Sequence, residues 1–269
     1  MESRELMHGG QAVVPATAVV HALGPAPAIP TGAIQQALAD SFAARSTAGQ
    51  TIPTRDGAIF LPSGLVPGRN YPLVVAFGYN GDPEVPFEVW RTQGREAKWI
   101  VYASRNYANA VLHGGLASSE SVAGRVKAQV DALSGVLPID RGRILLTGMS
   151  GGANFAEFMN LRYPGYAAGI IINSGRVPSQ LFRDAPTPGF LTIPSASDFA
   201  GSRRVAVFLA SPTDPDFYGI SQANARTLER LGWQTLFLSF PGGHRNAPPA
   251  IYRQAIAWIK SRPSWATTP

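Results

Sequence analysis

Six short apolar runs between residues 72 and 240 constrain the fold of this chain more than any other feature. Each run is nearly continuous in apolar and β-branched residues, which is typical of strands covered on both faces. The runs are PLVVAF (72–77), WIVYAS (99–104), RILLTG (143–148), AGIIINS (168–174), RVAVFLA (204–210) and TLFLSF (235–240). Stretches with helical spacing of apolar residues separate most of them, at 84–97, 119–137, 152–162, 220–231 and 249–261.

This alternation predicts an α/β fold with a mostly parallel central sheet and helices on both faces, because right-handed crossovers place each helix against the sheet. The segment 55–62 (RDGAIFLP) is expected to add an antiparallel edge strand. No repeat or linker interrupts the rhythm, so we predict one catalytic domain over residues 51–269. Residues 1–50 are expected to form a partly irregular N-terminal arm, with a short helix over 34–44.

Charge and composition exclude several classes of function. The 23 Lys and Arg exceed the 17 Asp and Glu by six, but the basic residues are scattered, and no basic stripe indicates nucleic-acid binding. The absence of Cys excludes disulfides, thiolate metal sites and a cysteine nucleophile. The chain contains no run of about 18 apolar residues, the length that a membrane-spanning helix needs. No paired His at ligand spacing is present, and we expect neither a metal nor a cofactor.

The first thirty residues leave the location of the protein open. Residues 12–30 (AVVPATAVVHALGPAPAIP) weakly resemble the apolar part of a signal peptide, but Pro15 and His21 interrupt the run. This segment is compatible both with secretion or a periplasmic location and with a cytoplasmic location. No pattern in the chain indicates an oligomeric state.

The most specific motif is GMSGG (148–152), which directly follows an apolar run and precedes a predicted helix. A strand, a G-x-S-x-G turn and a helix form a nucleophile elbow, in which the glycines permit a sharp turn and the serine hydroxyl lies above the sheet edge. The helix N-terminus there favours developing negative charge. We therefore predict Ser150 as a nucleophile.

A serine nucleophile needs a base, and four histidines are candidates. His244 follows the last apolar run in the loop PGGHRNAP, at the end of a predicted strand, and is the expected base. For His113, a structural hydrogen bond in a glycine-containing loop is the simpler interpretation. The remaining two, His8 and His21, lie in the N-terminal arm.

A carboxylate should orient the base. Asp214 comes directly after the run 204–210, with Asp216 as the second choice and Asp198 less well placed because it precedes the run. Alone, Asp214 would be read as a turn residue. The order Ser150, Asp214, His244, with each residue after a successive strand region, is the order expected of an α/β-hydrolase.

Two donors should stabilise the oxyanion of an acyl-transfer step. We expect one to be the backbone N–H of Gly151, next to the nucleophile. The other is expected from the loop FGYNG (77–81), through the backbone N–H of Tyr79, with the side-chain amide of Asn80 as an alternative.

These segments together resemble the α/β-hydrolase superfamily, especially esterases related to polyhydroxybutyrate depolymerases, feruloyl esterases and dienelactone-hydrolase-like enzymes. The resemblance rests on YPLVVAFGYNG, LPIDRGRILLTGMSGG, VAVFLASPTDP and PGGHRNAPPAIYRQAIAWI, in that order along the chain. It implies a single-domain α/β-hydrolase fold and a Ser-His-Asp esterase. Phe77-Gly78 departs from the His-Gly frequent in those relatives, Ser211-Pro212 replaces a glycine-containing turn, and the disulfides of the family are absent.

The expected function is cleavage of a small or polymeric carboxylic ester through an acyl-enzyme. A thioesterase, acyltransferase or peptidase would use the same triad, and a non-catalytic binding protein on this fold is a further alternative. The connections 104–118 and 175–203 are the candidates to cover the site. In the second, Phe182, Phe190 and Phe199 are expected either to line a pocket or to anchor the loop.

Overall fold

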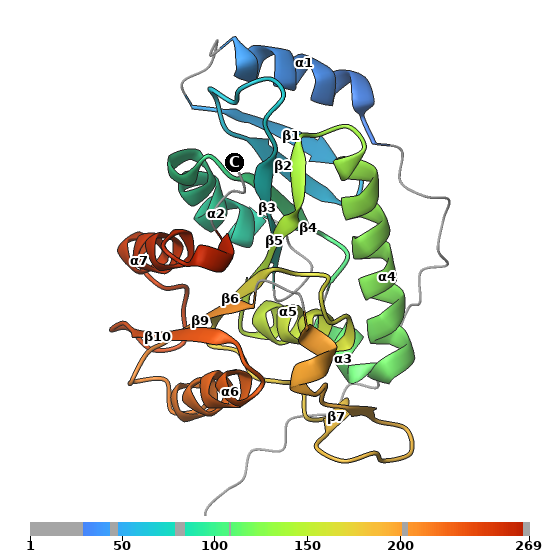
Figure 1. The fold of residues 1–269 in the computed structure, drawn as a ribbon, viewed down its shortest axis with the longest axis vertical. Helices are drawn as coiled ribbons and strands as arrows, with labels where there is room; N and C mark the ends of the chain where they lie inside the picture. Colours follow the sequence, from blue (N-terminus) through green and yellow to red (C-terminus); the bar gives the residue numbers. More distant parts are fainter. Residues whose placement is uncertain (1–28, 44–47, 79–83, 108, 201–203, 266–269) are drawn as a thin grey trace, which may run out of the picture.

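The chain folds around a sheet whose strands are the apolar runs of the sequence (Figure 1). The computed structural model describes residues 29–43, 48–78, 84–107, 109–200 and 204–265. The strands are β1 (Gln50–Thr54), β2 (Gly57–Leu61), β3 (Tyr71–Phe77), β4 (Ile100–Ser104), β5 (Ile139–Met149), β6 (Gly169–Asn173), β7 (Phe182–Arg183), β8 (Leu191–Thr192), β9 (Val205–Ala210) and β10 (Gln234–Ser239).

Helices connect most of these strands, as the sequence predicts. They are α1 (Thr31–Phe42), α2 (Glu84–Ala97), α3 (Asn109–His113), α4 (Gly115–Ser134), α5 (Gly151–Arg162), α6 (Tyr218–Arg230) and α7 (Pro249–Lys260), with short 3₁₀ helices at Ala196–Phe199 and Pro263–Trp265. The predicted helix of the N-terminal arm is thus present as α1. The division of the chain at residue 50 stays a prediction.

The main sheet has the order β1-β2-β4-β3-β5-β6-β9-β10. From β4 to β10 all neighbours pair in parallel, and β5 lies between β3 and β6 near the centre. The antiparallel segment expected over 55–62 is confirmed as β2, but the edge strand is β1, which forms a hairpin with β2. The carboxyl ends of the parallel strands therefore meet at one edge of the sheet.

Helices cover both faces of the sheet, which explains why the strands are apolar on both sides (Figure 1). Side chains of α2 and α7 pack on one face, and side chains of α1, α4, α5 and α6 pack on the other. The strands β2, β3, β4, β6 and β9 are buried along their whole length. The two end strands of the sheet, β1 and β10, are more exposed.

Two predicted connections are more ordered than loops. The segment 104–118 contains α3 and the first turn of α4. The segment 175–203 contains the two-residue pair β7–β8 and a 3₁₀ turn. Phe182 and Phe199 in it are buried against Phe158 and Trp233, with ring centroids 6.0 and 5.3 Å apart, so these two rings anchor the segment.

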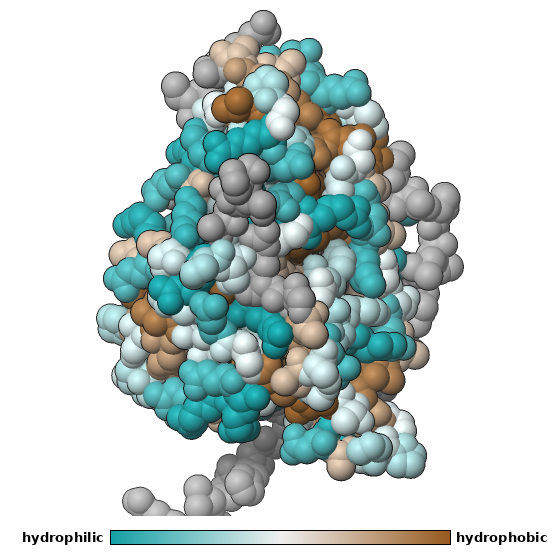
Figure 2. All heavy atoms as spheres, viewed as in Figure 1, coloured by the Kyte–Doolittle hydropathy of each residue, from teal (hydrophilic) through white to brown (hydrophobic). Residues whose placement is uncertain are grey.

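Figure 2 shows hydrophilic side chains over most of one face, with apolar side chains between them in small groups. In the described part of the chain, no helix is both long and apolar enough to cross a membrane.

Candidate active site

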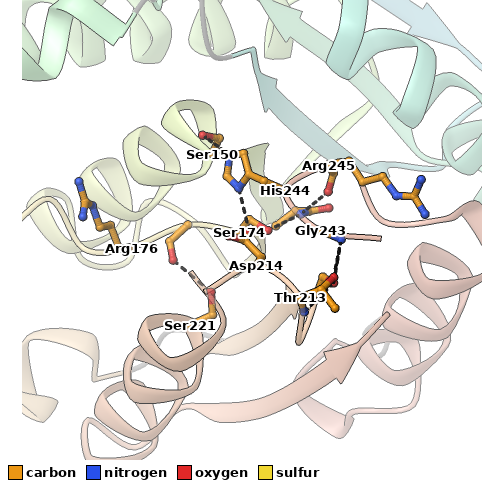
Figure 3. Close-up of polar contacts among 12 residues, drawn as sticks. Ser150, Ser174, Arg176, Thr213, Asp214, Ser221, Gly243, His244 and Arg245 are labelled. Atoms are coloured by element: carbon orange, nitrogen blue, oxygen red, sulfur yellow. Dashed lines mark hydrogen bonds and ion pairs between the residues drawn. The ribbon is translucent and has the colours of Figure 1, made fainter. Parts of the chain in front are cut away.

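Three residues predicted from the sequence lie together at the carboxyl edge of the sheet (Figure 3). Ser150 directly follows β5, Asp214 lies in the loop after β9, and His244 lies in the loop after β10. Because these strands are parallel and belong to one sheet, the loops that follow them emerge on the same side.

The three side chains form a continuous chain of hydrogen bonds. The Oγ of Ser150 is 2.9 Å from Nε2 of His244, and Nδ1 of His244 is 2.8 Å from Oδ2 of Asp214. The carboxylate is buried, with 3% of its side chain exposed, whereas 39% of the imidazole is exposed. A substrate therefore has access to the hydroxyl and the ring, while the charge that orients the ring is shielded from water.

The turn that presents Ser150 is strained and tightly packed. Ser150 has φ 54° and ψ −121°, in a region that non-glycine residues rarely occupy. A Cβ at Gly148 would lie 2.3 Å from the carbonyl carbon of Gly152, and one at Gly152 would lie 2.1 Å from the carbonyl oxygen of Phe77. The two glycines are thus required where α5 leaves the sheet, which is the local structure of a nucleophile elbow.

Asn173, at the end of β6, fastens the loop that carries His244. Its Oδ1 accepts the N–H of Ala247 at 2.6 Å and the O–H of Tyr252 at 3.1 Å, and its Nδ2 donates to the carbonyl of Arg245 at 3.1 Å. Asn173 is fully buried. The sequence analysis missed this residue, since nothing along the chain links the end of an apolar run to partners some 70 residues away.

The other side of the histidine loop is held by hydroxyls and by an aromatic ring. The N–H of Gly243 lies 2.9 Å from Oγ of Ser211 and 3.0 Å from Oγ1 of Thr213. The ring of Phe217 stacks on the imidazole of His244, with centroids 4.7 Å apart and planes inclined by 27°. Both sets of contacts restrict the imidazole to the orientation in which it reaches the serine.

One predicted oxyanion donor is described. Gly151 is the first residue of α5, where backbone N–H groups have no acceptor within the helix. A Cβ there would clash with Oδ1 of Asn109, so any other residue would require the Asn109 side chain to move. Tyr79 and Asn80, the candidates for the second donor, lie outside the described residues.

Of the remaining candidates, the three that are described, His113, Asp198 and Asp216, form no hydrogen bond with this cluster in the described structure. His113 is exposed on α3, and Asp216 is exposed beyond Asp214. Asp198 caps a 3₁₀ turn through Ser195, and these hydrogen bonds lower the pKa of its carboxyl. His8 and His21 lie outside the described residues. Within the described ranges, no three His, Asp or Glu side chains gather as metal ligands.

Beside the serine, the surface is hollowed by a small apolar pocket. It lies between the end of β5 and the helices α2 and α7. Its walls include Val85, Val89, Trp90, Met149 and Tyr252. A short apolar group attached to a carbonyl at Ser150 has a place to lie there.

Comparisons with known proteins agree with this architecture. No model of a known protein family matches the chain, and no curated protein matches it. Among solved structures, esterase PE8 matches with a TM-score of 0.52 and 19% identity, over 76% of this chain and 97% of its own. A hyperthermophilic esterase from Pyrobaculum calidifontis matches with a TM-score of 0.55 and 16% identity, over 84% and 88%.

A third match is FphF of Staphylococcus aureus, described as a fluorophosphonate-binding serine hydrolase, with a TM-score of 0.53 and 13% identity over 78% of this chain and 96% of its own. The narrower resemblance to depolymerases, feruloyl esterases and dienelactone hydrolases stays a prediction. The sheet order, the turn after β5 and these solved structures together show that the chain has the α/β-hydrolase fold.

Proposed function

We propose that this protein is a serine hydrolase that cleaves a carboxylic ester through a covalent acyl-enzyme. The observation that carries the proposal is the hydrogen-bonded series from Ser150 through His244 to Asp214, placed on a strained turn at a helix N-terminus. The esterases and the serine hydrolase that share the fold support the same class of reaction.

In the first half of the reaction, the Oγ of Ser150 attacks the ester carbonyl carbon while Nε2 of His244 takes its proton. The buried carboxylate of Asp214 accepts the N–H at Nδ1 and stabilises the imidazolium that forms. The N–H of Gly151, and in our proposal that of Tyr79, donate to the oxyanion. The imidazolium then gives its proton to the leaving alkoxide, and the acyl group stays on the serine.

In the second half, water replaces the alcohol. His244 takes a proton from the water, the hydroxide attacks the acyl carbon, and the imidazolium returns that proton to Ser150 as the acid leaves. We place the acyl group in the apolar pocket beside Met149, which favours a short or narrow apolar acid. Thioesters and amides enter the same mechanism, and a substrate panel separates them from esters.

The test is covalent labelling with a fluorophosphonate probe, read by intact mass and peptide mapping. We expect one adduct, on Ser150, which is absent in Ser150→Ala and strongly slowed in His244→Ala. His113→Ala is the matched control, because it removes an exposed imidazole outside the cluster and should label as the parent does. Turnover of p-nitrophenyl esters should fall by at least about 10³-fold in the first two variants.

A folded protein with no adduct would refute the proposal and favour a binding protein on a hydrolase fold. Undiminished turnover in Ser150→Ala would refute Ser150 as the nucleophile.

A further inference from the structure

A second cavity lies at the edge of the sheet opposite to Ser150. It is an open hollow of about 530 Å³ at the amino ends of β3, β4 and β5, bordered by the last residues of α2 and α7. Arg143 of β5 lines it, and Ser150 lies seven positions further along the extended strand, which corresponds to roughly 20 Å. The cavity is therefore no part of the proposed active site.

Cationic side chains line this cavity without a carboxylate among the lining residues. They are Arg69, Lys98, Arg143 and Lys260. Arg143 is neutralised by an ion pair with Asp140, at 2.5 Å. The described carboxylates form no ion pair with either lysine, so the cavity retains positive charge.

The two ammonium groups are positioned rather than free. Nζ of Lys98 donates to the carbonyl of Ser63 at 2.6 Å, and Nζ of Lys260 donates to the carbonyl of Ala97 at 3.1 Å. An ammonium has three N–H groups, so each lysine keeps donors for a further acceptor. Burial lowers the pKa of Lys260, because the charged ammonium is partly removed from water. A bound anion would stabilise the charged form again.

The backbone at Lys98 adds an independent observation. Lys98 directly follows α2 and has φ 59°, the left-handed conformation in which a helix end normally carries glycine. A non-glycine residue in this conformation is strained, because its Cβ approaches the following carbonyl oxygen. The chain has 20 Arg and only three Lys, yet two of the three, Lys98 and Lys260, line this one cavity. A lysine retained in this strained conformation is consistent with a role for its ammonium group, which glycine lacks.

Aromatic residues form another wall of the cavity. Trp99 and Trp265 line it with their ring centroids 5.8 Å apart, and Tyr71 lies beside them. Trp265 is 2% exposed, and its indole N–H has no hydrogen-bond partner in the described structure. Trp99 is likewise 2% exposed, so the two rings offer little apolar surface to the cavity, and the indole N–H of Trp265 is itself buried.

We propose that this cavity binds a small organic anion, with its carboxylate or phosphate between Lys98 and Lys260 and its apolar body against Trp99 and Trp265. The volume of about 530 Å³ lies within the range of small-molecule sites. The cations supply the larger part of the binding through charge-assisted hydrogen bonds, and the rings supply a small apolar contact.

The test is calorimetric titration of the unmodified protein with phenyl phosphate and with 3-phenylpropanoate. These probes share a ring and differ in headgroup, so their ranking distinguishes a phosphate site from a carboxylate site. Inorganic phosphate and benzyl alcohol supply each part alone. We expect saturable binding of one molecule of at least one ring-bearing anion, and weaker binding of both fragments.

Variants separate the charge from the fold. Lys98→Gly removes the cation and relieves the left-handed strain, so the melting temperature should hold or rise while affinity falls at least about tenfold. Lys98→Asn tests the same loss with a residue that tolerates this conformation, and Lys260→Gln tests the second cation. Lys127→Gln, which removes the remaining lysine, should bind as the parent does.

The proposal would be overturned if neither ring-bearing anion bound saturably, or if the parent, Lys98→Gly and Lys260→Gln bound with equal affinity. Loss of affinity in Lys127→Gln as large as in the other variants would also overturn it, because binding would then follow overall charge. None of these readouts depends on turnover at Ser150, so this proposal and the proposed function fail independently.

Discussion

Replacing Asn173 by Ala should destabilise the protein and impair the proposed catalysis together. The substitution leaves two buried donors without an acceptor, the N–H of Ala247 and the O–H of Tyr252, which are 5% and 2% exposed as residues. A buried polar group left unsatisfied costs about 1–3 kcal/mol. The carbonyl of Arg245, on an exposed residue, regains water instead. We therefore expect a loss of about 2–5 kcal/mol in the free energy of unfolding.

The assay is guanidinium unfolding followed by tryptophan fluorescence, with turnover measured on the same samples. Tyr252→Phe is the control, because it removes only one of the two donors and should cost about 1 kcal/mol. In the Asn173→Ala background the same Tyr252→Phe change should cost less, since the orphaned hydroxyl is no longer present. A free energy of unfolding for Asn173→Ala within about 0.5 kcal/mol of the parent would refute this account of the loop.

Four further predictions follow from the structure. Gly152→Ala should lower the free energy of unfolding by about 1–3 kcal/mol and abolish turnover, because its Cβ would clash with the carbonyl oxygen of Phe77. Gly124→Ala, where nothing lies within 4 Å, should keep or raise the melting temperature. Burial raises the pKa of Glu157 from 4.5 to about 8. Between these pH values the folded state holds a proton that the unfolded state has lost, so the free energy of unfolding should fall as the pH rises from 4.5 to about 8. The free energy of unfolding of Glu157→Gln should not fall in this way. Denaturation curves with the same pH dependence in the parent and in Glu157→Gln would contradict the raised pKa of Glu157. Phe217→Ala should lower kcat several-fold by freeing the ring of the proposed base, and an unchanged kcat would show that the stack has no positioning role.

The fold followed from the sequence wherever burial on both faces left an unbroken apolar run. The run AGIIINS predicts β6, and the order of Ser150, Asp214 and His244 predicts that they lie at one sheet edge. Those features are local, or follow from the parallel topology, and so can be read along the chain.

Features that depend on distant contacts were not predictable in the same way. The apolar spacing predicts a helix over 119–137, but α4 begins at Gly115, and the Ser119 hydroxyl donates to the carbonyl of Gly115 within the helix. β1 gives no apolar run, since only one of its residues is buried. Phe217 stacks on a ring 27 positions away in the sequence, where no spacing rule applies.

The chain separation within the proposed triad also has a consequence for folding. Ser150 and His244 are 94 residues apart, and their loops meet only after β10 has paired with β9. Contacts of such long sequence separation form slowly, because the intervening chain must first lose its freedom. Regained ester cleavage during refolding would therefore time the closure of the last parallel strand, and a nascent chain shorter than about 244 residues would be inactive however much of its sheet had formed.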